Sequence, residues 1–256
     1  MFKVLERIFR DRIATETISL AGSARYRGKL VGSVRGEALE KAVAACPVGA
    51  IGSEDGTIDY KRCIFCGRCV DAALAVTPQT TLQHKSEDAQ PFEGDGTLTS
   101  VDLAFQKRIG RSLHVRHLDA GSCNACDFEM GALSNPYYDL ARFGVHFVAS
   151  PRHADLLMVT GVVTRNLEYA LQSAYEAMPE PRLVMATGAC AAGGETYGAS
   201  YATVGAVDQV LPVDIYVPGC PPRPAAMLIA LLAAADMLND RMKSRSKKEL
   251  LEVHNE

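Results

Sequence analysis

Residues 182–194 read R-L-V-M-A-T-G-A-C-A-A-G-G, a strand-like apolar run that ends in glycines around a cysteine. Similar apolar and β-branched runs occur at 112–118, 144–149, 155–160 and 213–217. Helix-like patterns fall near 136–143, 164–177, 203–209 and 222–240. Alternation of this kind predicts an α/β fold in which helices cover both faces of a parallel sheet.

Four cysteines follow the ends of three of these predicted strands. Two come just past the strand at 112–118. A third lies three residues after the strand at 182–187, and the fourth lies three residues after the strand at 213–217. Loops at the carboxyl ends of parallel strands meet at one rim of the sheet, so we expect the four thiols to lie together there. They are Cys123, Cys126, Cys190 and Cys220.

Glycines stand beside two of these cysteines. Gly188 and Gly219 come shortly before them, and Gly193-Gly194 follows the first. Because glycine has no side chain, the backbone can turn sharply there and approach a bulky cofactor, and we expect Gly188 and Gly219 to line its site. The alternative is a group of inert buried thiols, which is common for single cysteines but does not explain four at strand ends.

The other four cysteines form a second complete set. Residues 63–69 read C-I-F-C-G-R-C, and a Cys-Pro pair stands upstream at 46–47. One half of a two-cluster bacterial ferredoxin holds its 4Fe–4S cluster in this way, with the fourth thiolate supplied by a separate Cys-Pro. A zinc ribbon is the rival, but it usually pairs two C-x2-C knuckles. The predicted cluster ligands are Cys46, Cys63, Cys66 and Cys69.

The second cluster of such a ferredoxin lacks all of its ligands. Its cysteines would stand at 36, 39 and 42, which are Gly36, Leu39 and Ala42, and its Cys-Pro at 73–74, which reads Ala73-Leu74. We expect the pseudo-symmetric fold to be kept, with apolar side chains filling the site that has lost its metal.

Composition narrows the class of protein. The chain has 256 residues, 48% hydrophobic and 22% charged, with a net charge of −3 and a pI near 6.1, which argues against nucleic-acid binding. The longest apolar stretch, 225–238, is broken by Asp236 and too short to span a bilayer. The first ten residues lack the apolar region of a signal peptide, so the eight cysteines are expected to be reduced metal ligands in the cytoplasm.

The chain divides at a polar segment. Residues 84–100 carry no periodic apolar pattern and are predicted to link a module at 1–83 to a larger domain at 101–256. The first ten residues form a predicted basic amphipathic helix that packs on its own domain or docks on a membrane or partner. The basic run at 241–248 is interpreted as a solvated helix face.

Three motifs carry a resemblance to a known family. They are H-L-D-A-G-S-C-N-A-C-D-F-E-M at 117–130, T-G-A-C-A-A-G-G at 187–194 and V-P-G-C-P-P-R-P at 217–224. Together they resemble the small-subunit family shared by nickel–iron hydrogenases and respiratory complex I, above all the small subunits of membrane-bound, energy-converting hydrogenases of the formate hydrogenlyase kind. Asn124 and Ala125 separate Cys123 from Cys126, which is the hydrogenase pattern, whereas complex I members typically have adjacent cysteines there.

The resemblance implies a flavodoxin-like domain whose four cysteines hold the proximal 4Fe–4S cluster. The partner would be a large subunit with the nickel–iron site. The N-terminal portion resembles the two-cluster ferredoxin-like subunit of the same complexes, so the chain is similar to a fusion of two neighbours with one cluster lost. Two 4Fe–4S clusters are therefore expected.

Two residues near the predicted ligands are singled out. The resemblance implies a catalytic role for Glu129 in moving protons near the large-subunit interface, which suits a carboxylate with a raised pKa; a helix-capping role is the alternative. Arg223 is expected to bind cluster sulfurs or a partner carboxylate, or else to be an ordinary surface arginine. We interpret Asp127 as an N-cap. His114, His117 and His153 lack ligand-like spacing and are interpreted as structural or surface residues.

The implied function is that of an electron-transfer subunit of a membrane-associated nickel–iron hydrogenase, peripheral on the cytoplasmic face of the inner membrane. Its implied partners are the large catalytic subunit, other iron–sulfur subunits and membrane-arm subunits, with no nucleic acid. The chain has no second pair of C-x2-C motifs to bind nickel. The alternatives are a complex I-like or nickel-free relative that uses a quinone or another acceptor, a redox-sensing module, and a flavin binder.

Overall fold

The computed structural model describes residues 19–23, 26–94, 112–194, 196 and 200–253, with side chains up to 244. The predicted N-terminal amphipathic helix lies outside the described residues, as does part of the predicted linker.

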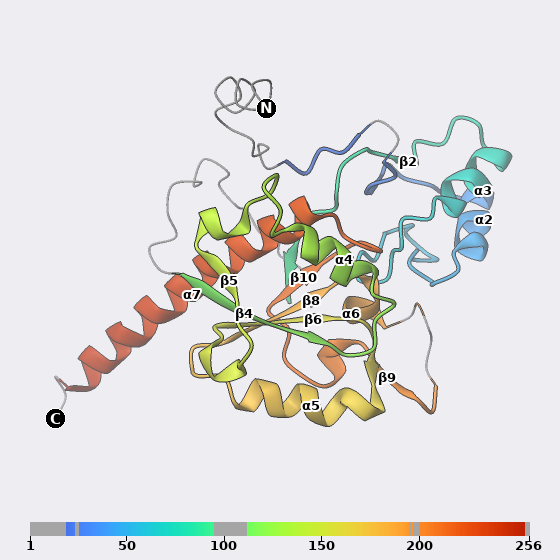
Figure 1. Ribbon diagram of the computed structural model, residues 1–256. Helices are drawn as coiled ribbons and strands as arrows, with labels where there is room; N and C mark the ends of the chain where they lie inside the picture. The colour runs from blue at the N-terminus through green and yellow to red at the C-terminus, as the bar shows by residue number, and fades with distance from the viewer. Residues whose placement is uncertain (1–18, 24–25, 95–111, 195, 197–199, 254–256) are drawn as a thin grey trace, which may run out of the picture.

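A six-stranded sheet forms the centre of the larger domain, in the order β3-β10-β8-β6-β4-β5 (Figure 1). The five parallel strands in the described residues are β4 (Leu113–Asp119), β5 (Val145–Phe147), β6 (Leu156–Thr160), β8 (Leu183–Thr187) and β10 (Ile215–Val217). Counted along the chain, they lie in the order 2-1-3-4-5 of flavodoxin-like folds. The predicted fold class and all five predicted strands are confirmed.

Helices cover both faces of this sheet. On one face lie α4 (Ala125–Ala132) and α7 (Pro224–Val253), and on the other lie α5 (Arg165–Glu176) and α6 (Ala189–Gly193) (Figure 1). Along β6, Leu156 and Met158 pack with the α7 side, whereas Leu157 and Val159 pack with the α5 side. Because both faces are buried, the strand is apolar throughout rather than alternating.

The helices agree less closely with the sequence patterns. The patterns at 164–177 and 222–240 correspond to α5 and the first part of α7, and α7 starts with proline at its first position, as helices often do. The pattern at 136–143 contains only a 3₁₀ turn, η2 (Leu140–Phe143).

The helix predicted at 203–209 is wrong. Its residues form β9 (Thr203–Gly205) and the 3₁₀ turn η4 (Val207–Gln209), and β9 pairs antiparallel with β7 (Val163–Thr164). Two β-branched residues favour a strand there. Gly205 then has a φ of 127°, which a helix cannot accommodate.

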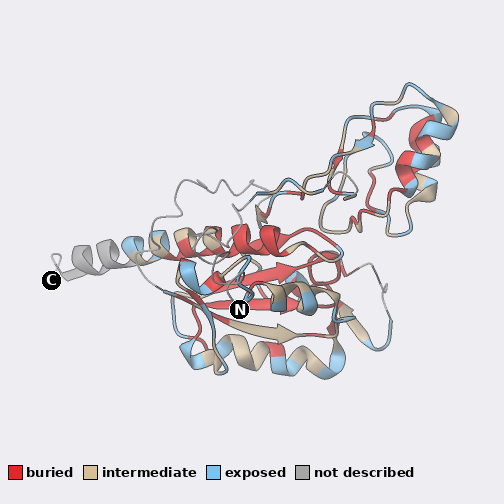
Figure 2. Cartoon of the chain, turned by 45° about the horizontal axis from the view of Figure 1, so that its top comes forward, coloured by how far each residue is buried: buried red, intermediate tan, exposed pale blue. Residues whose placement is uncertain are grey.

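The N-terminal module is built around two short helices, α2 (Glu37–Ala45) and α3 (Arg68–Val76), that pack on each other. A two-stranded sheet joins β1 (Leu30–Val31) to β2 (Gln83–His84). Figure 2 shows one buried core in the central sheet and α7, and a second, smaller one in this module. The residues expected to fill the missing cluster site all lie in the smaller core: Leu39, Ala42 and Ala73.

An extended arm connects the module to the sheet domain. Ala21 pairs antiparallel with Glu87, and Leu30–Val31 with Gln83–His84. Backbone hydrogen bonds run from Gly22 N to Ser86 O (2.6 Å) and from Asp88 N to Leu20 O (2.9 Å). The chain then forms β3 (Phe92–Glu93), which pairs antiparallel with β10. Part of the segment predicted as a linker is therefore an edge strand of the central sheet; the domain division itself stays a prediction.

Among the described residues, no helix has both the length and the apolar character of a membrane-spanning segment.

Candidate metal centres

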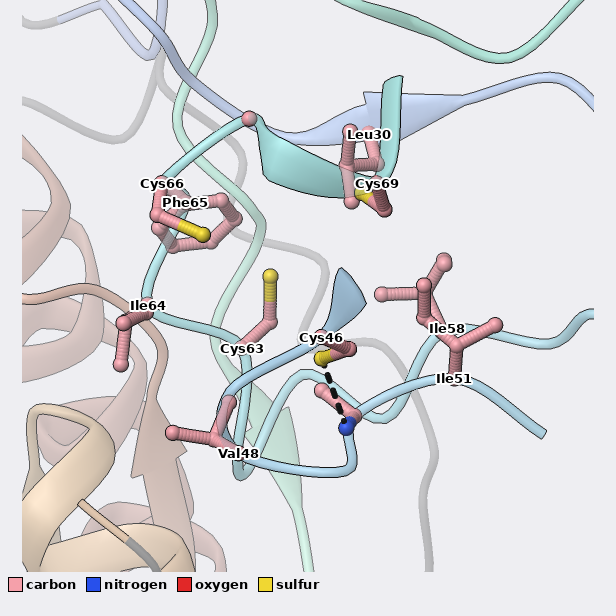
Figure 3. A pocket seen from close by; sticks show the side chains of 12 residues that line it. Leu30, Cys46, Val48, Ile51, Ile58, Cys63, Ile64, Phe65, Cys66 and Cys69 are labelled. Carbon is pink, nitrogen blue, oxygen red and sulfur yellow. Dashed lines mark hydrogen bonds between the residues drawn. The ribbon is translucent and has the colours of Figure 1, made fainter. Parts of the chain in front are cut away.

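The cysteines of the N-terminal set lie around one apolar hollow. Cys46 directly follows α2, Cys63 and Cys66 lie in the loop before α3, and Cys69 is in its first turn. Figure 3 shows the four sulfurs around a common space. The lining is completed by Leu30, Val48, Ala50, Ile51, Ile58, Ile64, Phe65 and Gly67. The predicted set is thus brought together around an apolar hollow.

Local backbone geometry explains how one loop presents two of these thiols. Phe65 and Gly67 both have positive φ values, 54° and 84°, which turn the loop around the hollow before α3 begins. The backbone N–H of Ala50 donates a hydrogen bond to the sulfur of Cys46 over 3.2 Å.

The electrostatics of the hollow keep its buried thiols protonated unless a cation is bound. The pKa of Cys63 is raised to about 12, mainly by burial and in part by the charges of the neighbouring thiolates, while a hydrogen bond from the backbone of Phe65 lowers it. The pKa of Cys69 is raised mainly by burial as well. Four thiolates cannot ionise together in an apolar space unless positive charge balances them. Bound iron would supply that charge.

The second set lies at the carboxyl ends of three parallel strands, as predicted. Cys123 and Cys126 follow β4, Cys190 is in α6 after β8, and Cys220 lies between β10 and α7. Burial raises the pKa of Cys126, and the charges of Cys190 and Cys220 add to it. Cys123 and Cys220 are exposed, so this set opens to the surface of the domain.

Gly188 and Gly219 keep the space around these thiols clear. A Cβ added to Gly188 would lie 2.7 Å from the sulfur of Cys126, and one added to Gly219 would collide with the backbone of Pro222. Both glycines have positive φ values, 88° and 145°. Because these glycines have no side chains, the loops that carry the cysteines can approach one another.

An unsatisfied hydroxyl lies beside Cys190. Burial raises the pKa of this thiol, while Thr196 lowers it. The buried Oγ1 of Thr196 has no hydrogen-bond partner of good geometry among the described residues. A hydroxyl aimed at a thiol suits a site in which sulfur atoms accept hydrogen bonds, as cluster sulfurs do.

A cluster and a single ion ask for different donor geometries. Among the described residues, which include all eight cysteines, no three His, Cys, Asp or Glu side chains converge as ligands of one metal ion. A zinc site needs four ligands at about 2.0–2.3 Å from one point, whereas in a cubane each iron binds one thiolate and the sulfurs stand apart.

Glu129 is half-buried in α4, three residues after Cys126. Its pKa is raised by burial, with a smaller contribution from the negative charge of Asp88, and it is lowered in part by Arg223. A raised pKa suits a proton-handling carboxylate, and that role of Glu129 stays a prediction.

Arg223 binds a carboxylate of its own chain. Its Nε and Nη2 donate to Oδ2 of Asp88 over 2.9 and 2.6 Å, and Nη2 also donates to the carbonyl of Leu20 over 2.8 Å. Tyr26 donates to the other oxygen of Asp88 over 2.5 Å, and the guanidinium lies over its ring. The sequence analysis did not identify Asp88 and Tyr26, because the polar residues of the arm show no periodic pattern.

Asp127 is not an N-cap. Asn124 is the residue before α4, with a φ of 65°, and Asp127 instead accepts hydrogen bonds from Ser122 (2.6 Å) and Thr160 (2.9 Å). It also lies 3.0 Å from Nε2 of His117. The left-handed turn of the Cys123–Cys126 loop displaces the helix start, so Asp127 faces inward.

The histidines occupy structural or surface positions. His117 bonds Asp127 and Thr160, and Nδ1 of His114 lies 3.2 Å from Asp155. His153 is exposed in the 3₁₀ turn η3 (Pro151–His153).

The family described as NADH ubiquinone oxidoreductase, 20 Kd subunit, matches residues 123–234, which contain all four cysteines of the second set. Over 143 residues the chain is 46% identical to the probable membrane-bound hydrogenase subunit mbhJ of Pyrococcus furiosus, a match that covers 56% of this chain and 86% of mbhJ. The chain belongs to this family. It is accordingly a subunit of an oxidoreductase, as the resemblance implied.

Two other members of the family are similar to the chain. Formate hydrogenlyase subunit 7 of Escherichia coli is 38% identical over 160 residues, which is 62% of this chain and 63%, less than two thirds, of that subunit. An NADH-quinone oxidoreductase subunit of Heliobacterium modesticaldum is 45% identical over 136 residues, covering 53% of this chain and 76% of that one. Hydrogenase and complex I-like members of the family are thus similar to the chain to comparable degrees.

Proposed function

We propose that the chain is an electron-transfer subunit with two 4Fe–4S clusters. One set of ligands is Cys46, Cys63, Cys66 and Cys69, and the other is Cys123, Cys126, Cys190 and Cys220. The observation that carries the proposal is that the four thiols of the first set line one apolar hollow, while those of the second set lie close enough for the charges of Cys123, Cys190 and Cys220 to act on Cys126. A bound 4Fe–4S cluster supplies one-electron chemistry at each set.

The two environments suit different tasks. The N-terminal hollow is lined by apolar side chains and encloses two buried cysteines. The second set has two exposed cysteines on a rim. An enclosed site suits the storage and relay of an electron, and a site on a rim suits exchange with a partner that covers it.

The partner we propose is a large catalytic subunit that docks on this rim. No residue of α4 is buried, and the side chain of Phe128 is 80% exposed beside Cys126. A partner that covered Phe128 would remove its apolar surface from water, which favours association. An obligate interface would bury on the order of 2,000 Å² or more. Glu129, on the same helix, would pass protons at that interface.

The hydrogenase interpretation takes precedence because Asn124 and Ala125 separate Cys123 from Cys126. The relatives named as formate hydrogenlyase subunit 7 and mbhJ belong to hydrogenases by name. We place the subunit at the cytoplasmic face of the inner membrane, together with other iron–sulfur subunits and membrane-arm subunits. The alternative is a complex I-like or nickel-free complex with a quinone or other acceptor, which the similarity to the NADH-quinone oxidoreductase subunit favours.

Metal analysis tests the proposal. The anaerobically purified chain is expected to contain about eight iron and eight acid-labile sulfide per chain, as two 4Fe–4S clusters require. A value near four, or stoichiometric zinc, would contradict it. Nickel in the purified native complex, together with hydrogen evolution, distinguishes the hydrogenase from the complex I-like alternative.

A further inference from the structure

Backbone of the N-terminal module lies close to backbone of the sheet domain beside Gly193. A Cβ added to Gly193 would lie 2.7 Å from the carbonyl oxygen of Lys61 and 2.9 Å from its carbonyl carbon. Gly193 stands three residues after Cys190 at the end of α6, and Lys61 stands two residues before Cys63. Backbone next to one cysteine set therefore lies against backbone next to the other.

A polar clamp holds this contact. The Nζ atom of Lys61 lies 3.2 Å from Oδ2 of Asp208 and 4.0 Å from the ring centre of Tyr216. The hydroxyl of Tyr216 donates to the same carboxylate oxygen over 2.9 Å. Asp208 lies in η4, which packs on α6, so the ion pair fixes the module directly behind Cys190.

A second connection runs through the arm. Nη1 of Arg27 donates to the carbonyl of Cys66 over 2.8 Å, and the neighbouring ring of Tyr26 lies 4.7 Å from the guanidinium of Arg223. Arg223 stands three residues after Cys220. This route joins the same two sets, but through two long arginine side chains and an aromatic ring.

We propose that electrons pass between the two cysteine sets across the Lys61–Gly193 contact. This inference rests on the proposed function, because it requires a cluster at each set. In each transfer the cluster at one set is oxidised by one electron and the cluster at the other is reduced by one, with no proton or further reactant. The clamp of Lys61, Asp208 and Tyr216 keeps the contact closed.

Packing favours this contact over the arm. Ala191 and Ala192 are buried, so the chain between Gly193 and Cys190 lies in protein rather than water. Main-chain atoms of Lys61 are the nearest atoms to a Cβ built at Gly193, the last residue of α6. Transfer through the arm would depend on rotatable side chains.

Substitution at Gly193 tests the route. Gly193→Ala and Gly193→Val introduce a side chain where main-chain atoms of Lys61 already stand, and Gly193 has no positive φ that a side chain would strain. The matched control is Gly131→Ala, another helical glycine near a cysteine, whose added Cβ would meet nothing within 4 Å. Tyr26→Leu removes the ring from the rival route.

The measurement uses the full chain with both clusters, reduced by a substoichiometric pulse of dithionite and freeze-quenched for electron paramagnetic resonance. Iron is counted first in each variant. We expect Gly193→Val to lose the fast redistribution of the electron between the two signals and Gly193→Ala to lose part of it. Gly131→Ala and Tyr26→Leu should retain it.

Fast redistribution that persists in Gly193→Val with full iron content would overturn the inference, as would a loss in Tyr26→Leu as large as in Gly193→Val. A wild-type chain with eight irons but no redistribution would also overturn it while leaving the two clusters in place. A chain without iron would overturn the proposed function and this inference with it.

Discussion

Arg223 and Asp88, 135 residues apart in the chain, form an ion pair of 2.6 Å that ties the loop of Cys220 to the N-terminal arm. Asp88 is 3% exposed, so its carboxylate depends on this partner and on Tyr26. The pair therefore joins the two parts of the molecule on the side of Cys220, as Lys61 and Asp208 do on the side of Cys190.

Replacing Arg223 by alanine is expected to lower the free energy of unfolding by about 3 kcal/mol, because it leaves a buried carboxylate without its cation. Denaturant unfolding of the single variants and of the double variant with Asp88→Asn would measure the coupling between the two side chains. The control is Lys243→Ala, which breaks a pair of 3.3 Å between well-exposed side chains and should change stability by less than about 0.5 kcal/mol. Additive effects of Arg223→Ala and Asp88→Asn would contradict the coupling.

Phe128 is predicted to anchor the large subunit. Phe128→Ser should weaken co-purification of that subunit, because an apolar side chain that is 80% exposed in the free chain would be buried in the complex. Tyr169→Ser is the matched control, since Tyr169 is 79% exposed on α5, on the opposite face of the sheet. If both variants lost the large subunit equally, docking on the cysteine rim would be contradicted.

The site that has lost its cluster is predicted to act as core. Leu39→Ala should lower the free energy of unfolding by about 2–3 kcal/mol, because Leu39 is 6% exposed among the helices of the module. Leu74→Ala, at a position 42% exposed, should cost under about 1 kcal/mol. Both values come from denaturant unfolding. Iron bound at this site in the natural protein would refute the assignment.

Protonation of His117 in mild acid is expected to lower the stability of the folded protein. Burial lowers its pKa below the ordinary 6.5, against the opposing effect of Asp127, so the folded state binds fewer protons than the unfolded one. The stabilisation is complete above about pH 6.5 and is lost as the pH falls through the lower pKa of the folded state. His117→Gln should flatten the change in melting temperature between pH 7 and pH 5, and His153→Gln, at an exposed position, should not. Identical pH profiles for wild type and His117→Gln would exclude this role.

The sequence predicts the sheet well because its strands are buried on both faces. The run from Leu156 to Thr160 is apolar or β-branched at every position, and all five residues are buried. Cysteines just past such strands then had to share a rim. The short spacing from Cys63 to Cys69 likewise kept three thiols around one hollow, and the residue after α2, Cys46, supplied the fourth.

Other features could not be predicted because they depend on contacts between distant segments. The pairing of Asp88 with Arg223 and of Lys61 with Asp208 leaves no periodic signal in the sequence. The edge strand β3 lies in a polar stretch that is ordered only by pairing with β10. The sequence at 203–209 resembles a helix because it shows neither the positive φ of Gly205 nor the pairing of β9 with β7.

The central claim is that each set of four cysteines holds its own 4Fe–4S cluster, and electron paramagnetic resonance of the reduced full chain tests it most directly. Wild type should give two signals, Cys66→Ser should remove only that of the N-terminal cluster, and Cys190→Ser should remove only the other. A single signal that either substitution abolishes, or a spectrum that neither changes, would contradict the account.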